Sequence, residues 1–262
     1  MIKQLILLEG LPGTGKTTAT QTLFDGLSSI GEDIVALFEG DDRIPCDFYE
    51  MAGIPVKEYD AFHALHSDIT EALWGVSMRT ANYVYLRLDR CSDFIAEAFR
   101  KWDMGDERNQ QVDVLHYVAC ALERLDHWVS LNVGNENTVI IDSGFLQNPI
   151  NELLFRGASD EAVRSFILET MKRVKPLHPF CFYLRRENAE TAMTFARQAK
   201  GDAWSAGIDA LLEMPGCANF FEHRFELELD LLPSMPHVIC FVQGNDWSDF
   251  ERQAERFLHG SF

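Results

Sequence analysis

The chain has 262 residues, 47% of them hydrophobic, which is enough to bury the core of one large α/β domain and makes two small domains the weaker expectation. A formal net charge of −18 argues against binding to nucleic acid or to an anionic membrane, because both need clustered lysine and arginine. The six cysteines have no metal-ligand spacing, and no apolar run is long enough for a signal peptide or a membrane span, so we expect reduced thiols and a cytoplasmic protein.

Residues 2–8 form a predicted buried strand, and a glycine-rich turn follows it directly. The turn, residues 10–17, fits the phosphate-binding pattern G-x-x-x-x-G-K-[ST] at every fixed position. Its glycines allow a sharp turn that exposes consecutive N–H groups, which form an anion site together with the N-terminus of the next helix. The predicted residues for binding the phosphates of ATP are Gly10, Pro12, Gly13, Thr14, Gly15, Lys16, Thr17 and Thr18.

Two side chains of this loop have predicted roles in chemistry. Lys16 would reach the β- and γ-phosphates, and the Thr17 hydroxyl would complete a Mg²⁺ shell shared with phosphate oxygens. The alternative is a glycine-rich turn with an exposed lysine on a surface loop. The lysine and the hydroxyl occur together behind a strand, which favours the phosphate site.

A helix over residues 17–27 leads to a second buried strand, residues 33–38, which ends in three acids. In parallel sheets ligands bind beyond the carboxyl ends of the strands, so these acids would face the same crevice as the phosphate loop. Each acid alone could belong to a solvated turn, but we expect at least one to function. Glu39 is the first candidate to orient or deprotonate an acceptor hydroxyl, with Asp41 or Asp42 as alternatives.

The third buried strand begins at Thr138, about 100 residues after the second, although a parallel crossover needs only about a dozen residues. Helical segments are predicted at 61–74, 91–102 and 112–129. The aromatic segment 82–87 is read as core, with a pocket wall as the alternative. We therefore expect a helical insertion at about 43–135.

Asp142 ends the third strand, which covers residues 138–142. After a buried strand, an acid in this position can hold Mg²⁺ through water, whereas the alternative is a helix cap. We favour the metal role because the chain already contains Lys16 and Thr17. Helices are predicted next at 150–155 and along an apolar face from Val163 to Val174.

The fourth buried strand, residues 179–184, runs into the densest positive patch of the chain. Arg185, Arg186 and Arg197 could close over a transferring phosphoryl group and stabilise its charge, and solvated helix charge is the alternative for at least one of them. Residues 221–232 fit both an alternating strand and a helix, and we predict a helix. A fifth strand follows at 237–241, and a capping box at Ser248 opens the last helix.

Five predicted strands alternate with helices and give an α/β protein with a parallel sheet covered on both faces. The segment from Leu8 to Thr18, the acids after strand two and the arginines after Leu184 resemble the nucleoside and nucleotide kinases, including thymidylate-kinase-like proteins. The segments 38–42, 145–149 and 222–229 look like uncharacterised phosphate-loop proteins of that superfamily.

This resemblance implies a three-layer α/β/α sandwich with strand order 2-3-1-4-5. It also implies ATP on the loop of strand one, an acceptor under the long insertion and an arginine-bearing lid at about 185–215. The sequence departs from those kinases at Ser143, where they commonly have an arginine that contacts the acceptor, and in lacking an R-x-x-x-R lid pair.

The function expected from these features is an ATP- and Mg²⁺-dependent small-molecule kinase. Its acceptor would be a hydroxyl or phosphate of a nucleoside-like, nucleotide-like or other small compound. The alternative is a nucleotide-dependent switch or ATP-binding module that makes no phosphorylated product. A guanine-binding N-K-x-D stretch is missing from the sequence, which argues against a GTPase, and a homodimer is left open.

Overall fold

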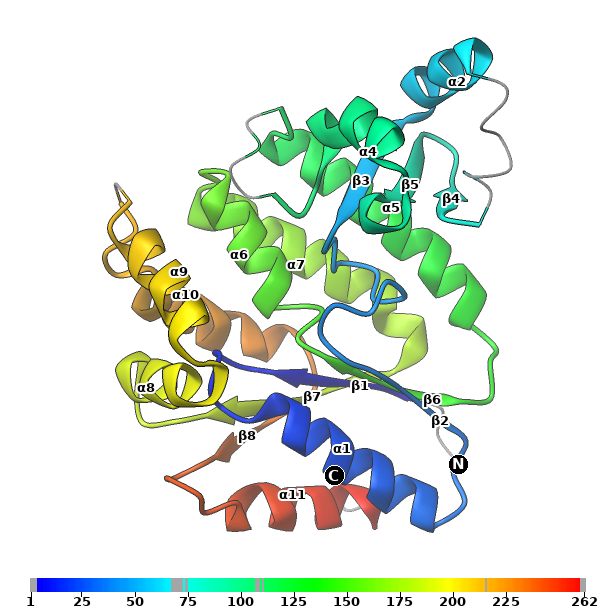
Figure 1. Cartoon of the computed structure of the whole chain (residues 1–262). Coiled ribbons are helices and arrows are strands. Elements are labelled where there is room, and N and C mark those ends of the chain that lie inside the picture. Colours follow the sequence, from blue (N-terminus) through cyan, green and yellow to red (C-terminus); the bar gives the residue numbers. More distant parts are fainter. Residues whose placement is uncertain are drawn as a thin grey trace.

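The computed structural model describes residues 4–66, 73, 75–106, 109, 111–214 and 216–259. Its centre is a five-stranded, all-parallel sheet with the order β2-β6-β1-β7-β8 (Figure 1). Counted along the chain, this is the 2-3-1-4-5 order of a phosphate-loop fold, as predicted. The strands are β1 (Leu5–Glu9), β2 (Ile34–Leu37), β6 (Thr138–Asp142), β7 (Pro179–Arg185) and β8 (His237–Phe241).

Helices bury both faces of this sheet, so that the central strands are apolar throughout. On β1, Leu5 and Leu7 point into the core on one face, while Ile6 and Leu8 point into the core on the other, which is the period of two expected for a strand. The helices of the second face are α1 (Lys16–Ser29) and α11 (Ser248–Leu258). The first face carries α5 (Val114–Asn132), α6 (Gln147–Phe155), α7 (Asp160–Val174) and α10 (Phe220–Leu231).

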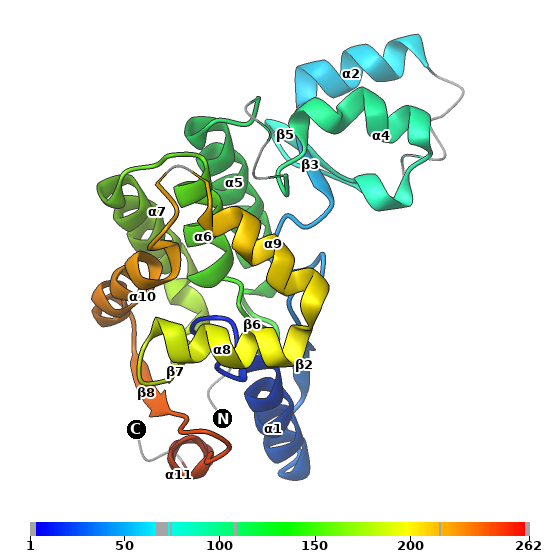
Figure 2. The ribbon, with the colours of Figure 1, turned by 60° about the vertical axis from the view of Figure 1, so that its left-hand side comes forward.

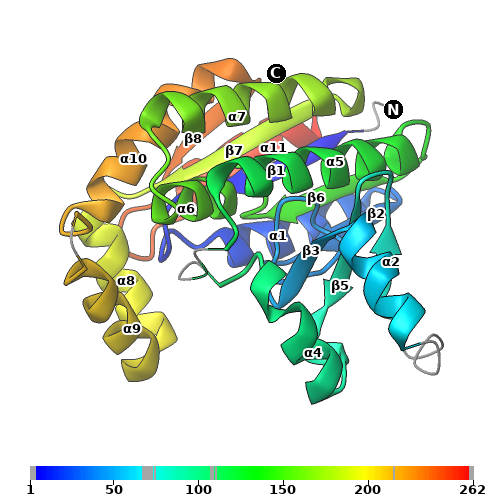
Figure 3. The ribbon, with the colours of Figure 1, turned by 90° about the horizontal axis from the view of Figure 1, so that it is seen from above.

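Two segments extend from the sandwich on the same side (Figure 3). One is the helix pair α8 (Ala189–Lys200) and α9 (Asp202–Leu212), which follows β7 (Figure 2). These two helices make up most of the segment predicted to be the lid, about 185–215. The other is the insertion between β2 and β6. Short 3₁₀ turns occur at Leu88–Arg90, Arg100–Trp102, Lys175–Leu177 and Leu232–Ser234.

The insertion is not the purely helical segment that we predicted. It contains a three-stranded antiparallel sheet, in the order β3-β5-β4, formed by β3 (Met51–Pro55), β4 (Ser77–Arg79) and β5 (Tyr83–Arg87). This sheet and the helices α2 (Val56–Leu65) and α4 (Asp93–Phe99) share a small apolar core of their own. The aromatic and branched residues of 83–86 favour a strand. The two neighbouring strands β3 and β4 supply hydrogen-bond partners for its backbone N–H and C=O groups.

The aromatic segment of the insertion serves packing. Tyr85 is buried, and its hydroxyl donates to the carbonyl of Cys120 at 2.7 Å. The predicted helix 61–74 ends at Leu65, and residues 67–72 and 74 lie outside the described residues.

Two local predictions near the C-terminus have different outcomes. Residues 221–232 are helical, as predicted, and the strand-like alternation reflects a helix buried on most of its sides. The capping box at Ser248 was wrong: Ser248 is the first helical residue, and the Asp246 carboxylate accepts its backbone N–H at 2.9 Å. All six cysteines are unpaired. No helix in the described ranges combines the length and apolar character needed to cross a membrane.

Candidate functional site

The turn between β1 and α1 has the backbone of an anion cradle. Gly10, Gly13 and Gly15 have φ angles of 135°, 79° and 94°, which glycine adopts without strain. Helix α1 begins at Lys16, so the N–H groups of its first turn lack partners within the helix and point toward the loop. The predicted phosphate-binding residues thus form one concave turn at the carboxyl end of the central strand.

Close neighbours leave no room for side chains in this turn. A Cβ atom on Gly13 would lie 2.1 Å from the carbonyl oxygen of Ala192 in α8. On Gly15 it would lie 2.2 Å from the ring of Trp247, just before α11. The loop is therefore packed between the two segments that follow β7 and β8.

Lys16 is buried within the loop, with 6% of its surface exposed, which does not fit the alternative of an exposed lysine on a surface loop. Its Nζ donates to the carbonyl of Leu11 at 3.1 Å, and the Thr14 hydroxyl donates to the same oxygen at 2.8 Å. Burial lowers the pKa of Lys16, while the nearby carboxylates of Asp142 and Glu39 act to raise it. The ammonium group is thereby held between the loop and two acids.

Thr17 and Asp142 meet in the structure, although they lie 125 residues apart in the sequence. The Thr17 hydroxyl donates to Asp142 Oδ2 at 2.7 Å, and the Ser143 hydroxyl donates to Asp142 Oδ1 at 2.7 Å. The contact follows from the sheet, because β1 and β6 are neighbours in a register that pairs Leu8 with Asp142. Helix α6 begins only at Gln147, so Asp142 is not its cap.

This pair suits a hard cation with oxygen ligands such as Mg²⁺. Among the described residues, no group of three or more His, Cys, Asp or Glu side chains could hold a metal ion. A Mg²⁺ ion held by Thr17 and Asp142 would therefore need phosphate oxygens and water to complete its shell, which is usual for nucleotide-bound magnesium.

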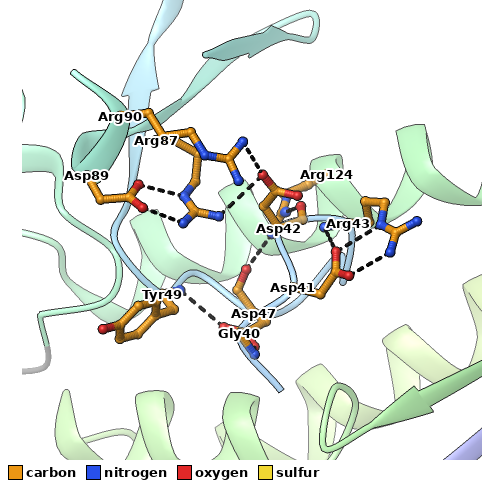
Figure 4. A network of polar contacts seen from close by, with 10 residues as sticks. All are labelled: Gly40, Asp41, Asp42, Arg43, Asp47, Tyr49, Arg87, Asp89, Arg90 and Arg124. Atoms are coloured by element: carbon orange, nitrogen blue, oxygen red, sulfur yellow. Dashed lines mark hydrogen bonds and ion pairs between the residues drawn. The ribbon is translucent and has the colours of Figure 1, made fainter. Parts of the chain in front are cut away.

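The three acids after β2 have different surroundings. Asp41 accepts two hydrogen bonds from the guanidinium of Arg43, at 2.9 and 2.7 Å. Asp42 forms ion pairs with Arg87 at 3.3 Å and Arg90 at 2.7 Å, which join the loop to the insertion (Figure 4). Both carboxylates are thus occupied by arginines.

Arg124 of α5 holds the loop that carries these acids (Figure 4). Its buried guanidinium donates to the backbone carbonyls of Asp42, Pro45 and Asp47. The Asp47 carboxylate accepts the N–H groups of Gly40 and Tyr49, at 2.8 and 3.1 Å. The segment that shapes the surroundings of Glu39 is therefore rigidly tied.

Glu39 contacts helix α6 and lines a cavity. Its Oε1 accepts a hydrogen bond from Gln147 Nε2 at 2.8 Å. A cavity of about 510 Å³ opens beside it. The residues that line this cavity are Glu39, Gly40, Cys46, Asp47, Phe48, Tyr49, Gly105, Asn148, Asn151 and Glu152. Two cavities of about 370 and 360 Å³ flank Trp128 instead, and of the predicted site residues only Asp42, an alternative base, lines one of them.

The predicted lid lies against the phosphate loop. Helix α8 contacts Gly13 through Ala192, and Lys200 at its end places Nζ 3.8 Å from Glu39 Oε2. Elements from two distant parts of the chain thus meet over the same edge of the sheet.

Arg186 contacts the backbone of the phosphate loop. Its guanidinium donates to the carbonyls of Gly13 at 2.7 Å, Val242 at 3.3 Å and Gly244 at 3.0 Å, and it stacks on the ring of Phe195. Burial lowers its pKa. Arg186 therefore joins the phosphate loop to the segment after β8.

The other two predicted lid arginines also have partners elsewhere. Arg185 lies over the rings of Phe225 and Phe241. Arg197 donates to the Asp209 carboxylate in α9 at 2.5 Å. Of the three predicted lid arginines, Arg186 is therefore the one that the structure brings to the phosphate loop, whereas Arg185 and Arg197 have other partners.

Sequence reasoning missed a buried carboxylate at the end of β1. Glu9 has no exposed surface, and its two oxygens accept the N–H groups of Phe145 at 2.7 Å and Gln147 at 3.0 Å. Burial raises the pKa of Glu9 to about 7, and the charge of Glu228 acts in the same direction. The only sequence signal was an acid at the end of an otherwise apolar strand.

A buried arginine was missed as well. Arg224 in α10 has no exposed surface and donates to Glu228 at 2.6 Å, to Gln147 at 3.2 Å and to the Gly10 carbonyl at 3.3 Å. The Glu228 carboxylate also accepts the Tyr183 hydroxyl at 2.7 Å. Gln147, Arg224 and Glu228 lie within the segments 145–149 and 222–229, whose resemblance pointed to these regions without giving roles.

No family model and no curated protein matches this chain. The functional argument therefore depends on the fold and on the contacts among its own residues.

The raised pKa of Glu9 predicts a specific pH dependence of stability. Between pH 4.5 and about 7 the Glu9 carboxyl binds its proton more tightly in the folded protein than in the unfolded chain. The protonated carboxyl therefore adds to the free energy of unfolding at low pH, and this added stability is lost as the pH rises toward 7. Denaturant unfolding of wild type and Glu9→Gln at pH 5 and pH 8 measures it. We expect the stability difference, wild type minus variant, to fall by on the order of 2 kcal/mol. A difference that rises with pH would mean that the two N–H groups keep the carboxylate charged.

Proposed function

We propose that this protein is an ATP- and Mg²⁺-dependent small-molecule kinase. The observation that carries the proposal is the hydrogen bond of 2.7 Å between Thr17 and Asp142, directly behind a complete phosphate loop. In such an arrangement the loop amides and Lys16 bind the β- and γ-phosphates, and Thr17 and Asp142 hold Mg²⁺. The ion, when bound, supplies positive charge for the oxygens that bridge the phosphates.

Glu39 would be the residue that acts on the acceptor. It lies on the wall of the 510 Å³ cavity and is an electrostatic neighbour of Lys16. In the transfer, the acceptor oxygen would form a bond to the γ-phosphorus, the bond between the γ-phosphorus and the bridging β-phosphate oxygen would break to release ADP, and the acceptor proton would pass to Glu39.

The cavity favours a neutral or cationic hydroxyl compound over a phosphorylated one. Glu39, Asp47 and Glu152 line it, together with two asparagines, and none of the described lining residues is lysine or arginine. A phosphate group on the acceptor would need such a cation. Ser143, in place of the arginine common in nucleotide kinases, supports the same choice.

A nucleotide-dependent switch is the second candidate, and the contacts of α8 favour it. Ala192 packs on Gly13, and Arg186 binds the Gly13 carbonyl, so phosphate binding to the loop would bear directly on α8. Product stoichiometry separates the two candidates: a kinase makes ADP only when its acceptor is present, whereas a switch hydrolyses ATP slowly without one. Incubation with γ-labelled ATP and a metabolite extract tests both.

The Lys16→Ala variant should lose phosphoryl transfer by more than a hundredfold, because about 3 kcal/mol of charge stabilisation at the phosphates is lost. Lys172→Ala, on the exposed surface of α7, is the matched control and should keep normal transfer. Turnover is measured at saturating MgATP, with thermal melting as a check of folding. Near-normal turnover of Lys16→Ala would end the phosphate-loop assignment.

The Asp142→Asn variant tests the metal role. An asparagine can keep the contacts to Thr17 and Ser143, so the melting temperature should change by no more than about 2 °C. The Mg²⁺ concentration for half-maximal activity should rise, since a neutral oxygen attracts the ion less strongly. A loss of stability without a change in Mg²⁺ requirement would indicate a structural residue instead.

The Glu39→Gln variant tests the base. Glutamine keeps the size of the side chain but cannot take a proton, so acceptor-dependent transfer should fall by ~10²–10⁴-fold while ATP affinity is kept. Asp41→Asn changes a neighbouring acid that Arg43 occupies, and it should transfer normally in single-turnover measurements. If Asp41→Asn fails and Glu39→Gln does not, the base is misassigned.

A further inference from the structure

The three segments that resemble uncharacterised phosphate-loop proteins converge on one side chain. Segment 38–42 supplies Glu39, segment 145–149 supplies Gln147, and segment 222–229 supplies Arg224. These residues lie far apart in the chain, but Gln147 hydrogen-bonds to both of the others. The contact places the centre of this polar cluster between α10 and the end of β2.

The Gln147 amide has a defined orientation. Its Oε1 accepts from Arg224 at 3.2 Å, and its Nε2 donates to Glu39 Oε1 at 2.8 Å. A guanidinium group can only donate and a carboxylate can only accept hydrogen bonds. With the amide reversed, its NH₂ would face the Arg224 donors and its oxygen would face the Glu39 carboxylate, and both hydrogen bonds would be lost. Gln147 is 3% exposed and its own N–H is bound to Glu9, which leaves water little access to the amide.

Arg224 is itself fixed, and so it can hold the amide. Besides Gln147, its guanidinium binds Glu228 at 2.6 Å, Asn151 Oδ1 at 3.0 Å and the carbonyl of Gly10 at 3.3 Å. The last two partners belong to the cavity wall and to the first residue of the phosphate loop. One buried side chain therefore contacts the donor loop, the acceptor cavity and the amide that binds Glu39.

We propose that Gln147 is a positioning residue that holds Glu39 for proton transfer from the acceptor. This inference rests on the proposed kinase function. The amide binds Oε1 and leaves Oε2 of Glu39 as the oxygen that can receive the acceptor proton. Without the amide, the half-exposed carboxylate could rotate away from the cavity.

The other charged groups near Glu39 do not replace this contact. Lys200 of α8 approaches Oε2 at 3.8 Å from an exposed position. Lys16 and Asp47 interact with Glu39 electrostatically, without a hydrogen bond to it. The positive charge of Lys16 attracts the Glu39 carboxylate, whereas the negative charge of Asp47 repels it. Gln147 is the neighbour that fixes the carboxylate from the buried side.

The test compares Gln147→Met and Gln147→Glu with the control Tyr183→Phe, all in the full chain. Methionine keeps the length of the side chain but loses both hydrogen bonds. Glutamate can still accept from Arg224, but it sets a second carboxylate against Glu39. Phenylalanine removes the hydroxyl that binds Glu228, at the far end of the same buried cluster.

The first readout is an NMR pH titration that follows the ¹³C signal of the Glu39 carboxyl carbon. The signal is assigned as the one that disappears in the Glu39→Gln variant. Loss of a donor to the carboxylate should raise the midpoint by about one pH unit in Gln147→Met, and a second carboxylate should raise it further in Gln147→Glu. Tyr183→Phe should leave the midpoint unchanged. This measurement needs no acceptor.

The second readout is kinetic. Acceptor-dependent kcat should fall at least tenfold in Gln147→Met with ATP affinity kept, and the acid limb of the pH profile should move upward with the midpoint.

The outcomes separate the two proposals. An unchanged titration midpoint of Glu39 in both Gln147 variants overturns the positioning role even if the protein is a kinase. Equal shifts in Tyr183→Phe overturn it too, since they would reflect general loosening. If the midpoints shift as expected but no acceptor is ever phosphorylated, the proposed function fails while the Gln147–Glu39 interaction stands. If Gln147→Met does not fold, Gln147→Glu alone decides.

Discussion

Polar groups buried at the carboxyl ends of the central strands must each find a partner, because an unpaired group without water costs about 2 kcal/mol or more. Glu9 ends β1 and accepts the N–H groups of Phe145, just before α6, and of Gln147, its first residue, while Asp142 ends β6 and accepts the Thr17 hydroxyl. Tyr183 of β7 donates to Glu228 of α10. Each pair joins elements that are distant in sequence. Together these hydrogen bonds fix the positions of the phosphate loop, α6 and α10 relative to one another. The geometry of the candidate site therefore depends on the pairing of these buried polar groups.

Much of the fold could be predicted, because the signals for it are local. Apolar runs of strand length alternate with helical periodicity, and right-handed parallel connections leave few sheet orders to consider. The contact of Thr17 with Asp142 follows from the same information, since Thr17 lies in the helix that follows β1, Asp142 ends β6, and a phosphate-loop order makes these two strands neighbours. The helix α10 was harder, because burial on most of its sides weakens the amphipathic pattern.

The details of the site could not be predicted, because they depend on which charged groups meet across long separations. Asp42 pairs with Arg87 of the insertion, and no local pattern connects the two. The strand over 83–87 becomes recognisable only with its partner at 51–55. Arg224 looks like a charge on an ordinary helix until the fold buries it beside Glu228, which the spacing of four residues permits but does not require. Sequence alone therefore placed Glu39 first but kept Asp41 and Asp42 as alternatives, although arginines occupy both of those carboxylates.

The arginine at position 186 gives the phosphate loop a positive charge without touching a phosphate. In the described part of the chain its guanidinium donates to carbonyl oxygens, one of them that of Gly13, stacks on the ring of Phe195 and has no carboxylate partner. A buried charge with carbonyl partners is not neutralised, so its field extends to the neighbouring loop, where low polarity weakens screening. This matters in a chain with a formal net charge of −18, which repels anions at long range. Lys16, the N-terminus of α1 and Arg186 therefore gather positive charge at one turn, whereas Glu39, Asp47 and Glu152 give the neighbouring cavity a negative wall.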